Sequence, residues 1–323
     1  MRIIAFIKTF NGEDYITEAV ASIYNHVDEV VIADCCFGAM EKIVHPSRIT
    51  AGGLSSPAAR AAMDAIPDPD NKITRWDIGN LGGDQTIIYN QFVQHADVGD
   101  AIWLVDDDEV YPEALAQKLA AWIREGTYHA VWLPSRVYWH DFYHTRRDYG
   151  QLPHQRIYVK LDDSCHYVER NLDVRWLDSN GGIYGFGKPP KELYYKGQKY
   201  ESFVGTMSGD NEMWYYHYAY VRTIQRMLEK CVSQYIQNVE PERGDEWRHC
   251  QKYRDAIEFK IETYSWFTNH ESGEIAYEYS VHPLQDHKWA DRRWDTGRVA
   301  IDYKQARLLL GWEPPVNVNA GNI

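Results

Sequence analysis

The sequence has little of what marks secreted, disulfide-stabilised proteins. It contains five cysteines in 323 residues, an odd number, and two of them, Cys35 and Cys36, are adjacent. Such a set does not suggest a disulfide framework and favours a reducing compartment. We therefore expect a cytoplasmic location.

Long apolar stretches are also missing. The first residues, MRIIAFIKTF, contain an apolar run too short for a signal peptide. No later stretch approaches the roughly 20 apolar residues that cross a bilayer as a helix. The sequence therefore predicts a soluble chain, with a peripheral membrane contact left open.

Positive charge is scarce, since 34 Lys and Arg residues stand against 47 Asp and Glu, for a net charge of −13. A chain this acidic is a poor non-specific binder of nucleic acid or anionic membranes. The sequence shows no internal repeat and no low-complexity segment. Its hydrophobic content of 44% is ample for a large core.

Negative charge is concentrated in residues 101–113, AIWLVDDDEVYPE. The apolar start is typical of a buried strand, and the acids Asp106, Asp107, Asp108 and Glu109 follow it directly. Pro112 stands where a helix would begin. The acids are thus expected at the carboxyl edge of a sheet, where open α/β sheets bind ligands. Carboxylates there suit a hard divalent ion, and the alternative is a solvated acidic loop.

The first 126 residues alternate between short apolar runs and segments with helical spacing. Strands are expected at 3–7, 30–33, 73–76 and 101–105, and helices at 15–25, 56–66, 84–95 and 112–125. Strand, helix and strand joined by short links form right-handed units with parallel strands. The pattern therefore predicts an α/β, Rossmann-like fold with a mostly parallel central sheet flanked by helices.

The alternation ends after residue 126. A strand is expected at 129–134, followed by an aromatic and basic segment up to 161. From Tyr218 the spacing becomes helical, with Val221, Ile224 and Leu228 on one stripe. We expect one domain at 1–215, with a ligand-binding half (1–126) and an acceptor half (127–215), and a helical extension at 216–323.

Several motifs follow one another in an order that resembles family 2 glycosyltransferases with the GT-A fold. They are the turn TFNGE at 9–13, Asp34, the pair Tyr89–Asn90 and the acids at 106–109. That family has a T-x-N-E-like turn after its first strand, an Asp after the second and a D-x-D after a later one. Tyr89 stands where the family has Arg, and only the first Asp of its D-D-G-S is kept.

The back half resembles the branch with a D-A-D-E motif that includes bacterial lipopolysaccharide-core glucosyltransferases. The segments QRIY at 155–158, PKEL at 190–193 and HYAY at 217–220 are similar to that branch's Q-x-R-L-F, V-H-E-x-L and H-Y-S-Y. The last of these opens a helix in that branch. Lys191 replaces a His of the second motif.

The resemblance implies a nucleotide-sugar site. The residues expected to hold the nucleotide sugar are Thr9, Asn11, Glu13, Asp34, Asn90, Asp106 and Asp107. A Mn²⁺ or Mg²⁺ ion on the diphosphate would be held by Asp106, Asp108 and His217. His217 could instead be a structural member of its aromatic cluster.

Transfer to a hydroxyl also needs a base within hydrogen-bond reach of the acceptor. Glu192 is the expected base, with Asp178 and Glu169 as alternatives. Arg156 and Trp139 are weaker candidates for contacts with phosphate or acceptor. The alternatives are an internal ion pair for Arg156 and a core position for Trp139.

The sequence therefore predicts a metal-dependent, inverting transfer of a hexose from a nucleotide sugar, most simply UDP-glucose, to a glycoconjugate or other hydroxyl acceptor. A non-catalytic sugar-binding protein on a degenerate GT-A fold is the main alternative. A sugar nucleotidylyltransferase is less favoured, because residues 10–13 contain one Gly and an acid rather than a Gly-rich basic loop.

Overall fold

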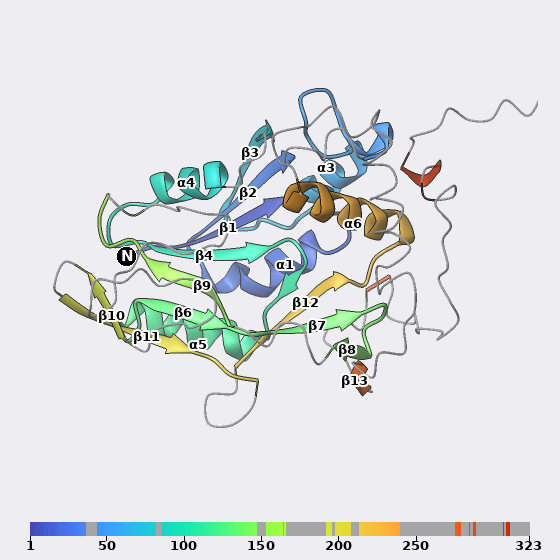
Figure 1. Ribbon diagram of the computed structural model, residues 1–323. Coiled ribbons are helices and arrows are strands. Elements are labelled where there is room, and N and C mark those ends of the chain that lie inside the picture. The colour runs from blue at the N-terminus through green and yellow to red at the C-terminus, as the bar shows by residue number, and fades with distance from the viewer. Residues whose placement is uncertain are drawn as a thin grey trace, which may run out of the picture.

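The computed structural model (Figure 1) describes residues 1–36, 44–81, 86–146, 153–163, 165, 192–195, 198–207, 213–239, 275–278, 284, 287–288, 306 and 308–310. For 192–195, 232–239 and 275–278 it describes the backbone alone. The predicted helical extension beyond residue 239 lies almost wholly outside these residues, as do Asp178 and Glu169.

An eight-stranded sheet forms the centre of the molecule, in the order β10-β11-β6-β9-β4-β1-β2-β3. Its strands are β1 (Ile3–Thr9), β2 (Glu29–Cys36), β3 (Ile73–Asn80), β4 (Ala101–Asp106), β6 (Ala130–Leu133), β9 (His154–Val159), β10 (Glu192–Tyr195) and β11 (Gln198–Val204). The first four are mutually parallel. Strand β9 runs antiparallel to β4 and β6, and β11 runs parallel to β6. The mostly parallel α/β sheet expected for a GT-A fold is therefore confirmed.

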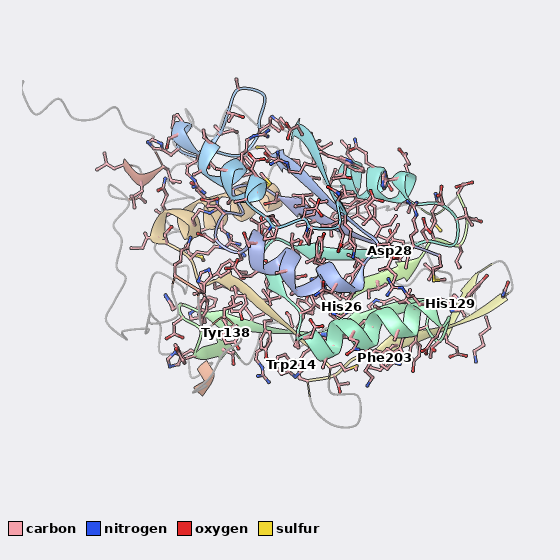
Figure 2. All side chains as sticks on the ribbon, turned by 180° about the vertical axis from the view of Figure 1, so that it is seen from behind. His26, Asp28, His129, Tyr138, Phe203 and Trp214 are labelled. Atoms are coloured by element: carbon pink, nitrogen blue, oxygen red, sulfur yellow. The ribbon has the colours of Figure 1, made fainter. Side chains whose placement is uncertain are left out.

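Helices cover both faces of this sheet. They are α1 (Ile16–Ile23), α3 (Pro57–Asp64), α4 (Thr86–His95) and α5 (Glu113–Arg124). Alternate residues of β1 explain the two layers, because Ile3, Ala5 and Ile7 pack with α1 and α5, whereas Ile4 and Phe6 pack with α4. Figure 2, seen from behind, shows α1 and α5 on the first of these faces.

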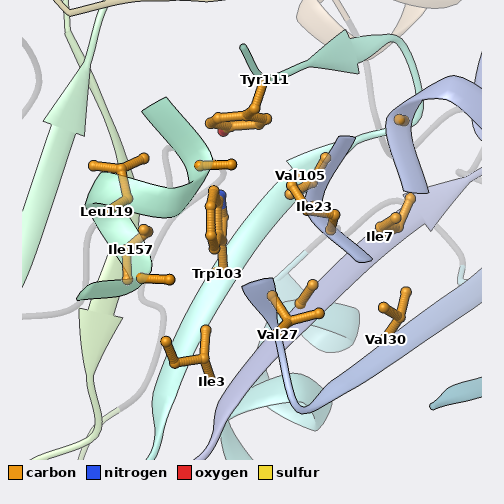
Figure 3. Packing of buried hydrophobic residues seen from close by; sticks show 14 of the residues in the cluster. Ile3, Ile7, Ile23, Val27, Val30, Trp103, Val105, Tyr111, Leu119 and Ile157 are labelled. Atoms are coloured by element: carbon orange, nitrogen blue, oxygen red, sulfur yellow. The ribbon is translucent and has the colours of Figure 1, made fainter. Parts of the chain in front are cut away.

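The core between β4 and α5 is built around Trp103, which is fully buried. Its ring meets Tyr111 edge-on at 5.1 Å between centroids, and Leu119 and Ile157 lie in the same cluster (Figure 3). This packing fixes the end of β4 relative to the chain that follows it. The acids after β4 are therefore attached to a rigid support.

Local signals account for several helix ends. Ser56 accepts a hydrogen bond from the Ala59 amide at 3.2 Å and caps α3, with Pro57 in the first position. Helix α5 begins directly after Pro112 and ends before Gly126, whose φ of +70° is the left-handed conformation that glycine adopts readily. These boundaries match the sequence-based expectation within two residues.

A five-stranded sheet continues from the first in the order β13-β8-β7-β12-β5. It contains β5 (Glu109–Val110), β7 (Ser135–Trp139), β8 (His144–Arg146), β12 (Tyr215–Tyr220) and β13 (Ile275–Glu278). The prediction that residues 217–220 open a helix is wrong, because they pair with β7 and β5, and helix α6 (Ile224–Val239) begins only afterwards. The domain boundary predicted at 215/216 falls inside β12.

Within the described residues, no helix is long and apolar enough to cross a membrane.

Candidate functional site

The carboxyl ends of β1, β2 and β4 are level with one another. Lys8 is paired with Asp106, and Thr9 with Asp34. Adjacent strands lie about 4.8 Å apart, so side chains at these ends meet. The edge thus gathers, from three strands, most of the polar residues that the sequence singled out.

Asp106 and Glu109 share one arginine. Arg156, on β9 and 4% exposed, places Nη2 at 2.6 Å from Glu109 Oε1 and Nη1 at 3.5 Å from Asp106 Oδ2. It also donates to the Tyr215 hydroxyl at 2.6 Å. Burial acts to raise the pKa of Asp106, but the charges of Arg156 and Lys8 outweigh it and hold the pKa below its usual value. Arg156 is therefore a fixed internal partner of residues 106–109, the acid turn.

Asp108 has two nitrogen neighbours. His217 Nε2 lies 3.2 Å from Oδ1, and Arg222 contacts Oδ2. Pairing of His217 with Glu109 across β12 and β5 brings this His to the acid turn. Burial acts to raise the pKa of Asp108, yet His217 and Arg222 hold it well below its usual value. The carboxylate form is therefore the stable one here.

Asp107 is held by the loop after β1. Thr9 Oγ1 donates to Asp107 Oδ2 at 2.6 Å, and Arg222 lies 3.8 Å from Oδ1. A Cβ at Gly12 would come within 2.4 Å of the same Oδ2, so only glycine allows this approach. Burial, followed by the charge of Asp108, raises the pKa of Asp107 to about 6.

Two lysines complete the positive charge around the acids. Lys8 donates to the Tyr89 hydroxyl at 2.9 Å, so Tyr89 still contacts the edge although it replaces the expected Arg. Lys230, on α6, lies 3.4 Å from the Ala219 carbonyl oxygen and 4.6 Å from the Tyr220 ring centroid. Burial lowers the pKa of Lys230 to about 8.

The strand ends beside the acids hold the residues expected to bind the nucleoside. Asp34 is 2% exposed and accepts hydrogen bonds from Ser55 Oγ at 2.6 Å and Arg60 at 3.1 Å. Burial raises its pKa despite these donors. Asn11 is fully buried at φ +57°, and its Nδ2 has no hydrogen-bond partner among the described residues. A buried amide without a partner is a donor suited to a ligand.

Glu13 forms an ion pair with Arg48 and lies in a buried network under α6. Arg226 joins Glu229 at 2.6 Å and donates to the Asn11 carbonyl at 2.7 Å. Glu229 is fully buried, 3.6 Å from Arg48. Helix α6, in front of the ends of β1 and β2 in Figure 1, is thereby tied to the turn at residues 10–13.

Two predicted site residues are not placed as the prediction requires. The backbone of Glu192, on β10, pairs with Glu201 on β11, and β10 lies four strands from β4 and level with its amino end. That is about 19 Å across the sheet alone, so the prediction of Glu192 as the base is not supported by its position. Trp139 is 4% exposed and packs on Tyr220 at 4.6 Å, so it is a core residue and not a surface for an acceptor. Asn90 is half-buried on α4.

The metal site predicted at Asp106, Asp108 and His217 stays a prediction. The described residues contain no group of three or more His, Cys, Asp or Glu side chains that could hold a metal ion. At Asp108, Oδ1 faces His217, another of the predicted ligands, whereas Oδ2 contacts the buried Arg222. An ion bound at Oδ2 would have to displace this arginine.

Sequence reasoning missed two of the cations near the acids. Arg222 and Lys230 come from residues more than 110 positions beyond the acids, on the turn after β12 and on α6. The one available signal was a basic residue five places after the predicted ligand His217, in a chain with a deficit of positive charge.

The sequence matches no protein-family model and no curated protein. Among solved structures, it is similar to residues 1–349 of S. aureus TarS, with 15% identity, a TM-score of 0.38, and coverage of 82% of this chain and 73% of that one. The UDP-GlcNAc complex of the same protein matches with 14% identity and a TM-score of 0.38, over the same shares of the two chains. Helicobacter pylori mannose-6-phosphate isomerase matches over 50% of this chain and 61% of its own, at 10% identity and a TM-score of 0.28. These likenesses are too distant to assign an activity.

Proposed function

We propose that this chain is a glycosyltransferase that moves a hexose from a nucleotide sugar, most simply UDP-glucose, to an acceptor hydroxyl. The observation that carries the proposal is the convergence at one sheet edge. Asp34 and the Asn11 amide stand beside the acid turn, which is surrounded by Lys8, Arg156 and Arg222. Polar groups for a nucleoside and cations for a diphosphate are therefore neighbours.

The reaction is a displacement at the sugar C1. The bond from C1 to the diphosphate oxygen breaks with its electron pair going to the diphosphate, and the acceptor oxygen forms the new bond to C1. Cationic side chains stabilise the leaving diphosphate, because its charge grows as the bond breaks. A single displacement inverts the configuration at C1, as the resemblance to the D-A-D-E branch implies.

The acceptor hydroxyl must lose a proton, and we assign the base to Asp106. Its side chain is 36% exposed, against 14% for Asp107, 8% for Asp108 and 0% for Glu109. A base must touch the acceptor from solvent, so exposure favours Asp106 among the four. Its pKa is held below the usual value, so it is ionised at neutral pH.

A thermal-shift screen tests the proposal. A ligand that binds only the folded chain raises its melting temperature, and the shift grows with ligand concentration. We expect UDP-glucose or another UDP-hexose to stabilise the protein, with adenosine, which has no phosphate, as the negative control. The absence of a shift with every UDP and GDP sugar, with or without Mn²⁺, would contradict the proposal. Binding without release of UDP in the presence of acceptors would favour the non-catalytic alternative.

A further inference from the structure

The acid turn is electrically compensated by the chain itself. Arg156 faces Asp106 and Glu109, while Arg222 faces Asp107 and Asp108. From the sequence alone, four adjacent acids needed either a bound cation or solvent to take up their charge, because like charges repel. The two buried arginines supply part of this compensation, although burial still raises the pKa of Asp107 to about 6 and holds the pKa of Glu109 well above its usual value.

Arg222 is held rigidly where it meets the acids. It is 5% exposed and stands directly between β12 and α6. Its Nε donates to the Ala219 carbonyl at 3.2 Å, Nη2 contacts Asp108, and the guanidinium carbon lies 6.0 Å from the Tyr15 ring centroid. A guanidinium carries five N–H donors in a planar fork, so one side chain can serve a carboxylate and a phosphate together.

Lys230 converges on the same point. Its ammonium lies 3.4 Å from the Ala219 carbonyl oxygen, the oxygen that also accepts from Arg222. Two cations sharing one carbonyl repel each other in a site screened from water, and the charged form of Lys230 is penalised by its burial. Asp108 already attracts the Lys230 ammonium and acts to raise its pKa. A further anion placed between the two cations would add to this attraction and relieve their mutual repulsion. The pair is therefore arranged as the receptor of an anionic group beside the acid turn.

We propose that Arg222 and Lys230 hold the diphosphate of the donor in place of a divalent metal ion, so that nucleotide binding and transfer are metal-independent. This inference rests on the proposed glycosyltransferase function and specifies how that site recognises its donor. A divalent ion on Asp106 and Asp108 would have to enter against the buried Arg222. The transfer then proceeds as written above, with the electron pair of the broken C1–O bond received by a diphosphate held on the two cations.

The test uses the full chain, stripped with EDTA and assayed with and without Mn²⁺. The probes are inorganic pyrophosphate, UDP and uridine, with binding followed by calorimetry. For pyrophosphate, and likewise for UDP, we expect the affinity of the wild type to be the same with and without Mn²⁺, within about twofold. Binding of either anion that requires Mn²⁺ would overturn the inference while leaving the proposed function intact. No binding of UDP, GDP or their sugars in either condition would overturn both.

Variants of Lys230 and Arg222 test whether these cations bind the anion or only stabilise the fold. Lys230→Met is expected to weaken pyrophosphate and UDP binding about tenfold or more while uridine binding stays unchanged, because uridine has no phosphate. Unchanged UDP binding would contradict the role of Lys230. Arg124→Met, which removes a 44% exposed arginine on α5, is the matched control and should alter neither. Arg222→Met removes the arginine from Asp107 and Asp108. If this variant folds, it should bind Mn²⁺ at these acids. A folded variant that binds no Mn²⁺ would contradict the inference that Arg222 takes the place of a metal ion.

Discussion

At the scale of single residues, the four acids of the turn have four different surroundings. Glu109 is fully buried against Arg156, Asp108 lies between His217 and Arg222, Asp107 accepts from Thr9, and Asp106 remains the most exposed. The four acids are adjacent in sequence, but their contacts and exposure differ. The contacts of each acid are set by the strands and loops that neighbour it.

Replacing Asp106 by Asn tests the assignment of the base. Asn keeps the size of the side chain but cannot accept the proton, so we expect kcat to fall by about 10²–10⁴-fold with UDP-glucose binding retained. The measurement is UDP release under saturating donor, alongside calorimetric binding. Asp163→Asn, at an 89% exposed position, is the control and should be fully active. Activity of Asp106→Asn within about twofold of wild type would move the base elsewhere.

Asp107 gives a prediction for the pH dependence of stability. Its folded-state pKa of about 6 exceeds the ordinary 3.8, so the folded chain holds this proton more tightly than the unfolded chain. The resulting stabilisation is complete below pH 3.8 and is lost as pH rises through about 6. Relative to Asp107→Asn, the wild type should lose about 1–3 kcal/mol of unfolding free energy between these limits. Urea unfolding at several pH values measures the difference, and parallel curves for the two proteins would refute it.

At the scale of elements, the sequence predicts the strands and helices of the first 126 residues well. Apolar runs and the Ser56–Pro57 cap are local signals, and the structure follows them. Strand β12 was taken for a helix start because its strand character comes from pairing with β7 and β5, which are distant in sequence. For the same reason, the acids of the site were predictable from one segment, whereas Arg222 and Lys230 were not.

Helix α6 is fixed over the strand ends by the buried network of Glu229, Arg226 and Arg48. Glu229→Gln leaves two arginines near a neutral group, and we expect the unfolding free energy to fall by about 2–4 kcal/mol. Glu201→Gln is the matched control, since Glu201 is 56% exposed beside Lys199 and its pair should be worth less than about 1 kcal/mol. Chemical denaturation compares them, and equal losses in both variants would show that the network does not hold α6.

At the scale of the whole molecule, the site joins segments from both ends of the described chain. Thr9 meets Asp107, Asp108 meets Arg222, and the Asn11 carbonyl meets Arg226. The predicted boundary at 215/216 would separate the acids from the arginine that compensates them. We therefore expect one cooperative unit to span that boundary at least as far as α6.

A fragment ending at residue 215 tests this unity. It retains the acid turn but lacks Arg222, so buried Asp108 loses its cation. We expect the fragment to show no cooperative melting, or a melting temperature at least about 10 °C below that of the full chain. Circular dichroism on heating provides the measurement. A fragment that melts cooperatively at the temperature of the full chain would show that residues 1–215 are an independent domain.

The separation of Asp108 and Arg222 by 114 positions also has a consequence for synthesis on the ribosome. At about 5–20 residues per second, the acid turn leaves the ribosome roughly 6–23 s before its arginine does. During that interval Asp107 and Asp108 lack the arginine that faces them in the folded chain. The site is therefore complete only after Arg222 and α6 have been translated, and a chain that stalls before them presents these two acids without that cation.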